Sequence, residues 1–150
     1  MKGWLLDTNV VTALASPNGA PSVKAWAYGQ PEHRMYLSVL ALAEFDTSIH
    51  NLEPDHPDRS RYMAARDALA HRFKNRLLSV DDPVVYRWGA IAGDVKRRIG
   101  HAPAVVDTLM AATAIQHDLI LATRNMKDTK DSGAVIFNPW TDDPSQFPLT

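Results

Sequence analysis

The sequence predicts an α/β fold, with a central parallel sheet and helices flanking both of its faces. Three observations lead there. Five short apolar runs are distributed along the chain, and the segments between them have helical character. Strands that alternate with helices are typical of parallel sheets, because each crossover between parallel neighbours needs a long connection. The length of 150 residues suits one domain and is short for two.

The five apolar runs are the predicted strands. They are 3–6 (GWLL), 35–38 (MYLS), 77–80 (LLSV), 119–122 (LILA) and 134–137 (AVIF). Several end at turn-forming or charged residues. Such brief, continuously apolar runs are typical of strands that are buried on both faces of a sheet.

Four helices are predicted between these strands. The first begins after Ser38, and the other three cover 58–74, 84–99 and 104–117. Ser38 can cap the first helix, Gly100 can end the third, and Pro103 falls near the first turn of the fourth, where proline is tolerated. The charged, alanine-rich helix over 58–74 is expected to turn Tyr62, Ala65, Leu69 and Phe73 inward.

The predicted domain spans 1–140, and a polar, loosely ordered tail follows at 141–150. The chain has no cysteine, which excludes disulfides and thiolate metal sites and fits a reducing compartment. No signal-peptide pattern or membrane-length apolar run is present, so we expect a cytoplasmic protein. The net charge of −1 gives no global basic field. A nucleic-acid substrate would therefore need local basic groups or a bound cation.

Two polar clusters stand where predicted strands end. Asp7 directly follows the first apolar run, and a polar cluster at 124–128 follows the fourth. Because parallel strands end at one edge of their sheet, these residues are expected on the same rim, where ligands of such sheets bind.

Two further acids lie in apolar surroundings. Glu44 lies within LSVLALAEFDTSI, and Asp107 has no other charged residue near it from 102 to 115. A buried carboxylate is costly unless it is paired or binds a metal. Together with Asp7 and Asp128, they would form an oxygen-rich site for a hard divalent cation. Such a cation can activate water and neutralise charge on a phosphate.

Each acid also has a purely structural interpretation. Asp7 could only cap a helix that begins at residue 8, and Glu44 could lie on the exposed edge of an amphipathic helix. Arg124 and Asp128 could form a surface ion pair of little energetic value. Asp107 is harder to explain in this way, because its neighbours on both sides are apolar.

Four segments together resemble the PIN-domain family, and within it the VapC-type toxins of type II toxin–antitoxin systems. They are LLDTNVV (5–11), LSVLALAEF (37–45), DTLMAATAIQHDLILATRN (107–125) and NPW (138–140). They occur in the family's order and are spread over nearly the whole chain. The resemblance implies a PIN fold and an endoribonuclease that depends on Mg²⁺ or Mn²⁺.

The resemblance also implies roles for individual residues. Asp7, Glu44 and Asp107 would bind the metal, and Asp128 would complete the catalytic set. The residues expected to support these acids are Thr8, Asn9, Thr123 and Asn125. Beside the site, Arg124 and Lys127 are candidates for binding the RNA backbone.

A protein partner is implied as well. Members of this family typically dimerise and bind an antitoxin that covers the acidic cleft and contacts DNA, in a heterotetramer or a larger assembly. The apolar candidates for that surface are Trp26, Tyr28, Met63 and Phe73, although aromatic residues at helical spacing also suit a core. A catalytically silent PIN module that only binds the antitoxin is the alternative function.

Two positions depart from the family pattern. Asp46 stands where a cation is common, and Thr129 stands where an aromatic residue usually follows the fourth acid.

A phosphatase of the haloacid dehalogenase type would also place an acid after its first strand. That family expects a second acid two residues later, and here the residue is Asn9.

Overall fold

The computed structural model describes residues 1–150 and contains one five-stranded parallel sheet in the order β3-β2-β1-β4-β5. The strands are β1 (Gly3–Leu6), β2 (Met35–Ser38), β3 (Leu77–Leu78), β4 (Leu119–Ala122) and β5 (Ile136–Phe137). The predicted α/β class is confirmed. β3 and β5 pair over only two residues each, so the predicted runs at 77–80 and 134–137 were too long.

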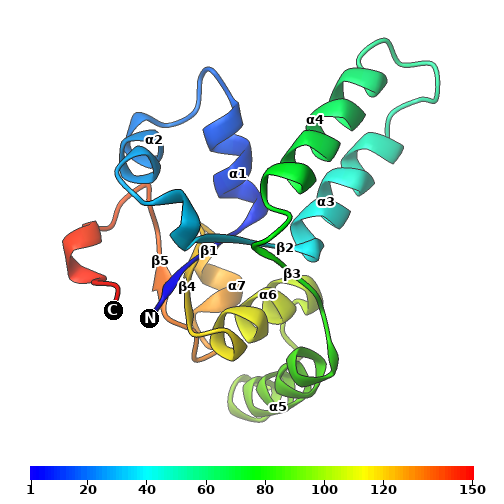
Figure 1. Ribbon diagram of the computed structural model, residues 1–150. Helices are drawn as coiled ribbons and strands as arrows, with labels where there is room; N and C mark the ends of the chain where they lie inside the picture. The colour runs from blue at the N-terminus through cyan, green and yellow to red at the C-terminus, as the bar shows by residue number, and fades with distance from the viewer.

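The two central strands explain why their sequences are continuously apolar. Every residue of β1 and β4 is buried, since helices cover both faces of the sheet (Figure 1). Trp4 and Leu6 belong to the larger core cluster, whereas Leu5 belongs to a separate cluster on α6. This alternation follows from the two-residue period of a strand. Leu6 pairs with Ala122, so the next residues of both strands lie side by side at the carboxyl edge.

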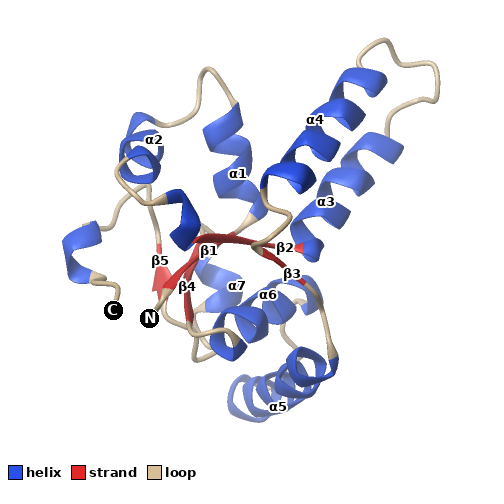
Figure 2. Cartoon of the chain, viewed as in Figure 1, coloured by secondary structure: helices blue, strands red, loops and turns tan.

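Seven helices surround the sheet (Figure 2). They are α1 (Thr8–Ala15), α2 (Pro21–Tyr28), α3 (Val39–His50), α4 (Arg59–Arg72), α5 (Asp82–Ile99), α6 (Val105–Gln116) and α7 (Met126–Thr129). The side chain of Ser38 accepts a hydrogen bond from the Leu40 N–H, and Gly100 ends α5 with φ of 88°. Both predicted helix ends are confirmed. The short helices α2 and α7 were not predicted, and α1 was considered only as the helix that Asp7 could cap. None of the helices combines the length and apolar character that a membrane span requires.

α3 and α4 form a hairpin that projects away from the sheet (Figure 1). α4 therefore has no fully buried residue, and Tyr62 and Ala65 are exposed, contrary to the prediction that they face inward. Asp46 and Arg66 join the two helices through a two-pronged ion pair of 2.8 and 3.1 Å. The acid at the first departure from the family pattern thus has an intramolecular partner.

An aromatic cluster closes the core beside β1 and β5. Trp26 packs edge-on against Trp4 at 5.2 Å between ring centroids, and Phe137 lies 5.0 Å from Trp4. Trp26 and Phe73 are both only 6% exposed. Trp26 is therefore a core residue, so of the two interpretations open for its ring the core placement is correct and the docking surface is not. Phe73 is also buried, although its ring forms part of a groove wall described below.

The C-terminal segment 141–150 packs on the domain and is not loosely ordered as predicted. Phe147 lies 5.0 Å from the Phe137 ring, and a short 3-10 turn at Pro144–Gln146 precedes it. The N–H of Thr150 donates to the carbonyl of Met1 over 2.9 Å. The segment is polar in composition, but its two apolar residues, Phe147 and Leu149, contact the main core.

This packing gives a stability prediction. We expect Phe147→Ala to lower the free energy of unfolding by about 2 kcal/mol, because a half-buried aromatic contact is lost. Urea denaturation checks the value, with Ser145→Ala as the control on the same turn. Equal stability of both variants and the wild type would show that the segment contributes nothing to the fold.

Candidate active site

Four elements bring the four predicted acids to the carboxyl edge of the sheet. Asp7 lies between β1 and α1, Glu44 on α3, Asp107 in the first turn of α6, and Asp128 on α7. Asp7 is buried, Glu44 and Asp107 are half-buried, and Asp128 is exposed. The group therefore extends from the end of the sheet to the solvent.

The pKa of Asp107 shows that these acids share one neighbourhood. Burial, followed by the negative charges of Asp7, Asp128 and Glu44, raises this pKa from 3.8 to about 6. A hydrogen bond from the Asn125 side chain acts in the opposite direction. The acids therefore repel one another, and this electrostatic situation favours a bound cation.

Neutral donors satisfy Asp7. Its Oδ1 accepts from the Thr8 N–H at 2.8 Å, and its Oδ2 accepts from the Thr123 hydroxyl at 2.7 Å and from Asn9 Nδ2 at 3.5 Å. The first bond caps α1, so the interpretation of Asp7 as a helix cap is correct. Asp7 Oδ2 does not take part in the cap and instead accepts from Thr123 and Asn9. Capping therefore accounts for only one of the two carboxylate oxygens.

Thr123 connects the acids to each other. Besides donating to Asp7, its oxygen accepts from Asn9 Nδ2 at 3.2 Å and from the Asn125 N–H at 2.9 Å. Asn125 Nδ2 then donates to Asp107 Oδ2 at 3.4 Å. On the other side, the Thr8 hydroxyl donates to Glu44 Oε1 at 2.8 Å. All four residues predicted to support the acids thus contact them directly or through one another.

The donor chemistry of the group suits a hard cation. None of the four acids forms an ion pair with lysine, arginine or histidine, so the suggested Arg124–Asp128 pair is absent. No three Asp, Glu or His side chains converge closely enough to hold a metal ion as they stand. Their ligand type still fits Mg²⁺ or Mn²⁺, because both prefer carboxylate oxygens.

Hydrogen bonds replace the aromatic packing that Thr129 lacks. Thr129 is 1% exposed, and its hydroxyl donates to the carbonyl of Asn125 over 2.7 Å. The Ser132 hydroxyl in turn donates to the Thr129 carbonyl over 2.6 Å. The second departure from the family pattern therefore leaves α7 anchored beside Asn125, and Asp128 stays at the edge of the site.

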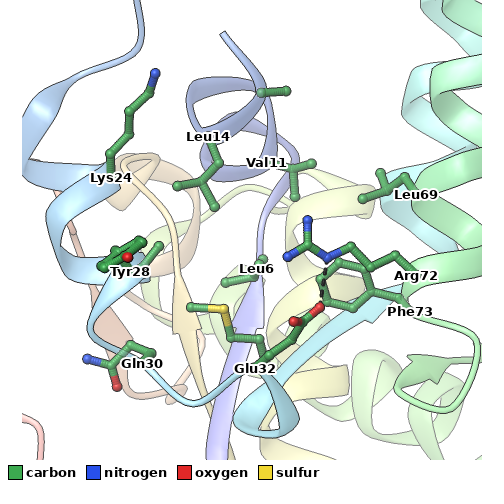
Figure 3. Close-up of a pocket in the computed structure, with 13 residues that line it drawn as sticks. Leu6, Val11, Leu14, Lys24, Tyr28, Gln30, Glu32, Leu69, Arg72 and Phe73 are labelled. Atoms are coloured by element: carbon green, nitrogen blue, oxygen red, sulfur yellow. Dashed lines mark hydrogen bonds and ion pairs between the residues drawn. The ribbon is translucent and has the colours of Figure 1, made fainter. Parts of the chain in front are cut away.

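A second feature is an open groove of about 530 Å³ between α1, α2 and α4 (Figure 3). Its apolar walls include Val11 and Leu14 from α1 and Leu69 and Phe73 at the end of α4. Tyr28, which is 96% exposed, stands at its edge. Of the predicted docking candidates, Tyr28 and Phe73 line this groove, whereas Met63 is exposed on α4 outside it.

The rim of the groove is charged. Glu32 accepts from Arg72 Nε at 2.7 Å, and this guanidinium, chiefly through the hydrogen bond, lowers the pKa of Glu32 (Figure 3). Lys24 stands on the opposite side of the groove (Figure 3). The sequence interpretation overlooked Val11, Leu14 and this rim. The apolar spacing of Val11 and Leu14 along α1 was the available signal.

Comparison with known proteins agrees with the fold. A family model described as the PIN domain matches residues 4–127. The toxin FitB of Neisseria gonorrhoeae is 30% identical over 138 residues, covering 92% of this chain and 99% of FitB. The ribonuclease VapC1 of Rickettsia felis is 31% identical over 130 residues, covering 85% of this chain and 89% of that protein.

A solved structure of a FitAB complex bound to a DNA fragment aligns with a TM-score of 0.82 at 28% identity. The alignment covers 93% of this chain and 97% of the matched one. The family model extends from β1 into the start of α7, so it includes Asp7, Glu44 and Asp107 but not Asp128. The resemblance seen in the sequence is confirmed. The chain belongs to the PIN-domain family.

Proposed function

We propose that the protein is a metal-dependent endoribonuclease that acts as the toxin of a toxin–antitoxin pair. The observation that carries this proposal is the group of four acids without ion-pair partners, in which burial and then the charges of the other three carboxylates raise the pKa of Asp107. The similarity to FitB and VapC1, named a toxin and a ribonuclease, supports it.

In this proposal Asp7, Glu44 and Asp107 hold Mg²⁺ or Mn²⁺. When bound, the cation lowers the pKa of a coordinated water and neutralises charge that develops on the scissile phosphate. Thr123 and Thr8 fix the oxygens of Asp7, and Asn125 orients Asp107.

The exposed residues have complementary tasks. Asp128 completes the acidic set on the side that faces solvent. Arg124 and Lys127, which are both exposed, bind the RNA backbone. Without the cation, the acids repel RNA, so basic groups at the rim and the metal are both needed for a productive complex.

The direct test measures cleavage of RNA by the wild type and by Asp7→Asn with Mg²⁺, Mn²⁺ or a chelator. We expect chelation and Asp7→Asn each to reduce the rate by at least about a hundredfold, since the site loses its cation. Asp94→Asn, which changes an exposed acid on α5, is the matched control and should keep full activity. Undiminished cleavage by Asp7→Asn would refute the metal site.

The groove between α1, α2 and α4 favours an antitoxin as partner. It is open, apolar and flanked by Lys24, Glu32 and Arg72, which suits an amphipathic helix. The FitAB complex is an assembly bound to DNA, and by analogy we propose that the antitoxin binds DNA and carries this chain with it.

We expect Leu14→Arg to abolish binding of the antitoxin proposed as partner while RNA cleavage remains. The reason is that a charge would enter the apolar wall of the groove, to which Leu14 belongs. Co-purification and cleavage assays check the two effects, with Val85→Arg on the exposed side of α5 as control. Retained binding by Leu14→Arg would place the partner elsewhere.

A catalytically silent module remains the second candidate, because the same groove would serve it equally well. Expression in bacteria separates the two functions. Growth arrest that Asp7→Asn relieves indicates an active toxin, whereas arrest that persists in this variant, or no arrest together with partner binding, indicates a silent module.

A further inference from the structure

The NPW segment forms a rigid turn directly after β5. Asn138 Oδ1 accepts from the Trp140 N–H at 2.9 Å, and Asp142 Oδ2 accepts from the Asn138 N–H at 2.8 Å. The Asn138 carbonyl accepts from the Asp142 N–H, also at 2.8 Å. The Ser22 hydroxyl donates to the Trp140 carbonyl at 3.5 Å. The half-buried indole packs against the main core, so its position is fixed.

The guanidinium of Arg124 lies over the indole ring of Trp140. The guanidinium carbon lies 4.7 Å from the ring centroid of Trp140, which is the distance of a cation–π contact. The backbone of Arg124 is tied to the site as well, because its N–H lies 3.5 Å from Asn9 Oδ1. Asn9 also contacts Asp7. The guanidinium is therefore held by the indole, and the backbone of the same residue is held by Asn9.

Arg124 differs from every other arginine of the chain. Each of the others donates a side-chain hydrogen bond or forms an ion pair. The guanidinium of Arg124 does neither and is exposed. Stacking on a ring uses the face of the guanidinium and leaves the N–H groups at its edge free. Those groups match the oxygens of a phosphate.

The guanidinium of Arg124 lies beside the acidic group. Arg124 directly follows Thr123, whose hydroxyl binds Asp7, so it lies at the rim of the acidic group. We infer that Trp140 is a positioning residue, which holds Arg124 ready to clamp a phosphate of the RNA beside the acids. This inference rests on the proposed ribonuclease function. Holding the side chain beforehand lowers the entropy cost of binding.

A double-mutant cycle tests the inference on the full chain carrying Asp107→Asn, so that RNA is bound and not cut. The readout is the Kd of a fluorescent single-stranded RNA in Mg²⁺ over a series of salt concentrations. We expect Arg124→Ala to raise Kd about tenfold and to reduce the slope of log K against log salt by about 0.7, the value for one phosphate contact. Arg61→Ala is the matched control, because Arg61 also stacks on a ring, Tyr62, but far from the acids along the α4 helix.

The decisive arm concerns Trp140. Trp140→Leu should raise Kd about fivefold when Arg124 is present and should have no effect on Arg124→Ala, whereas Trp140→Phe should retain most of the affinity. Arg124→Lys, an exposed change that leaves the fold intact, should also weaken binding, and only while the indole is present. A loss that is the same with and without Arg124 would overturn the inference and indicate base stacking on the indole or a structural role.

The outcomes also separate this inference from the proposed function. RNA cleavage by the unmodified chain together with no coupling between Trp140 and Arg124 would overturn only the clamp. A chain that neither binds nor cuts RNA would overturn both. An unchanged salt slope in Arg124→Ala would show that this guanidinium contacts no phosphate.

Discussion

Asp107→Asn is expected to abolish RNA cleavage and, at the same time, to stabilise the protein at pH 7. The stabilisation follows from the pKa of Asp107, which burial and the charges of Asp7, Asp128 and Glu44 raise from 3.8 to about 6. At pH 7 the folded protein must hold this carboxylate ionised against its neighbours. An amide of the same shape removes that cost. We expect a gain of about 1 kcal/mol, below the formal value of the shift because the group is only half-buried.

The direction of the pKa shift determines how the stability difference between Asp107→Asn and the wild type changes with pH. Because the pKa is higher in the folded state, the folded protein binds more protons than the unfolded chain between pH 3.8 and about 6. The stability of the wild type relative to Asp107→Asn therefore falls as the pH rises through this window. The difference should be near zero below the window and fully developed above it. Urea denaturation at several pH values in chelator measures it.

Adding Mg²⁺ should reverse the order of stability. A ligand that binds only the folded state stabilises it, and the variant has lost one carboxylate of the site. The wild type should consequently gain more from Mg²⁺ than Asp107→Asn does. Asp94→Asn, the exposed control, should match the wild type in both respects. If the stability of Asp107→Asn and of the wild type changes identically with pH and with Mg²⁺, Asp107 does not belong to the acidic group that binds the cation.

The strands were predictable because their burial is recorded in the sequence. β1 and β4 are covered on both faces, so every position must be apolar and the run is continuous. α2 was missed because it begins at Pro21 within a turn-rich segment and has only eight residues. α7 has four residues, which is too short for any periodic pattern.

The acids were predictable for a related reason. A charged residue in an apolar run, or at a strand end, stands out whatever the fold. The neutral partners do not stand out in this way. Two examples are the hydrogen bond from Thr129 to Asn125 and the ion pair of Asp46 with Arg66. Both depend on side-chain directions that no local sequence pattern contains.

Surface residues were the least predictable part. Trp26 and Tyr28 are two positions apart on α2, yet one is 6% exposed and the other 96%. The rotation of the helix decides which ring joins Trp4 in the core, and a single helix of eight residues leaves that rotation open. Likewise, Tyr62 is exposed only because the hairpin of α3 and α4 extends beyond the sheet (Figure 1).

Thr123→Val is expected to damage the acidic site although no charge is changed. The hydroxyl donates to Asp7 Oδ2 and accepts from Asn9 and from the backbone of Asn125. A valine of the same shape removes all three hydrogen bonds at a position that is 0% exposed. The Asn125 N–H is left without a partner, and Asp7 Oδ2 and Asn9 Nδ2 keep only their 3.5 Å contact with each other. We expect the free energy of unfolding to fall by about 1–3 kcal/mol, which is the cost of unsatisfied buried polar groups. Cleavage should fall by about ten- to a hundredfold, since the support of a ligating carboxylate is lost.

The comparison with Thr123→Ser makes this prediction specific. Serine keeps the hydroxyl and loses only a methyl group, so it should restore most of the activity even if the small cavity costs some stability. Thr113→Val is a second control, because Thr113 is equally buried but donates to the Leu109 carbonyl within α6. It should lose stability without a specific loss of cleavage. If Thr123→Val and Thr113→Val have the same effect on activity per unit of lost stability, the hydroxyl supports only the fold. If Thr123→Val alone loses activity, the hydroxyl couples Asp7 to Asn125, and through Asn125 to Asp107, as the hydrogen bonds indicate.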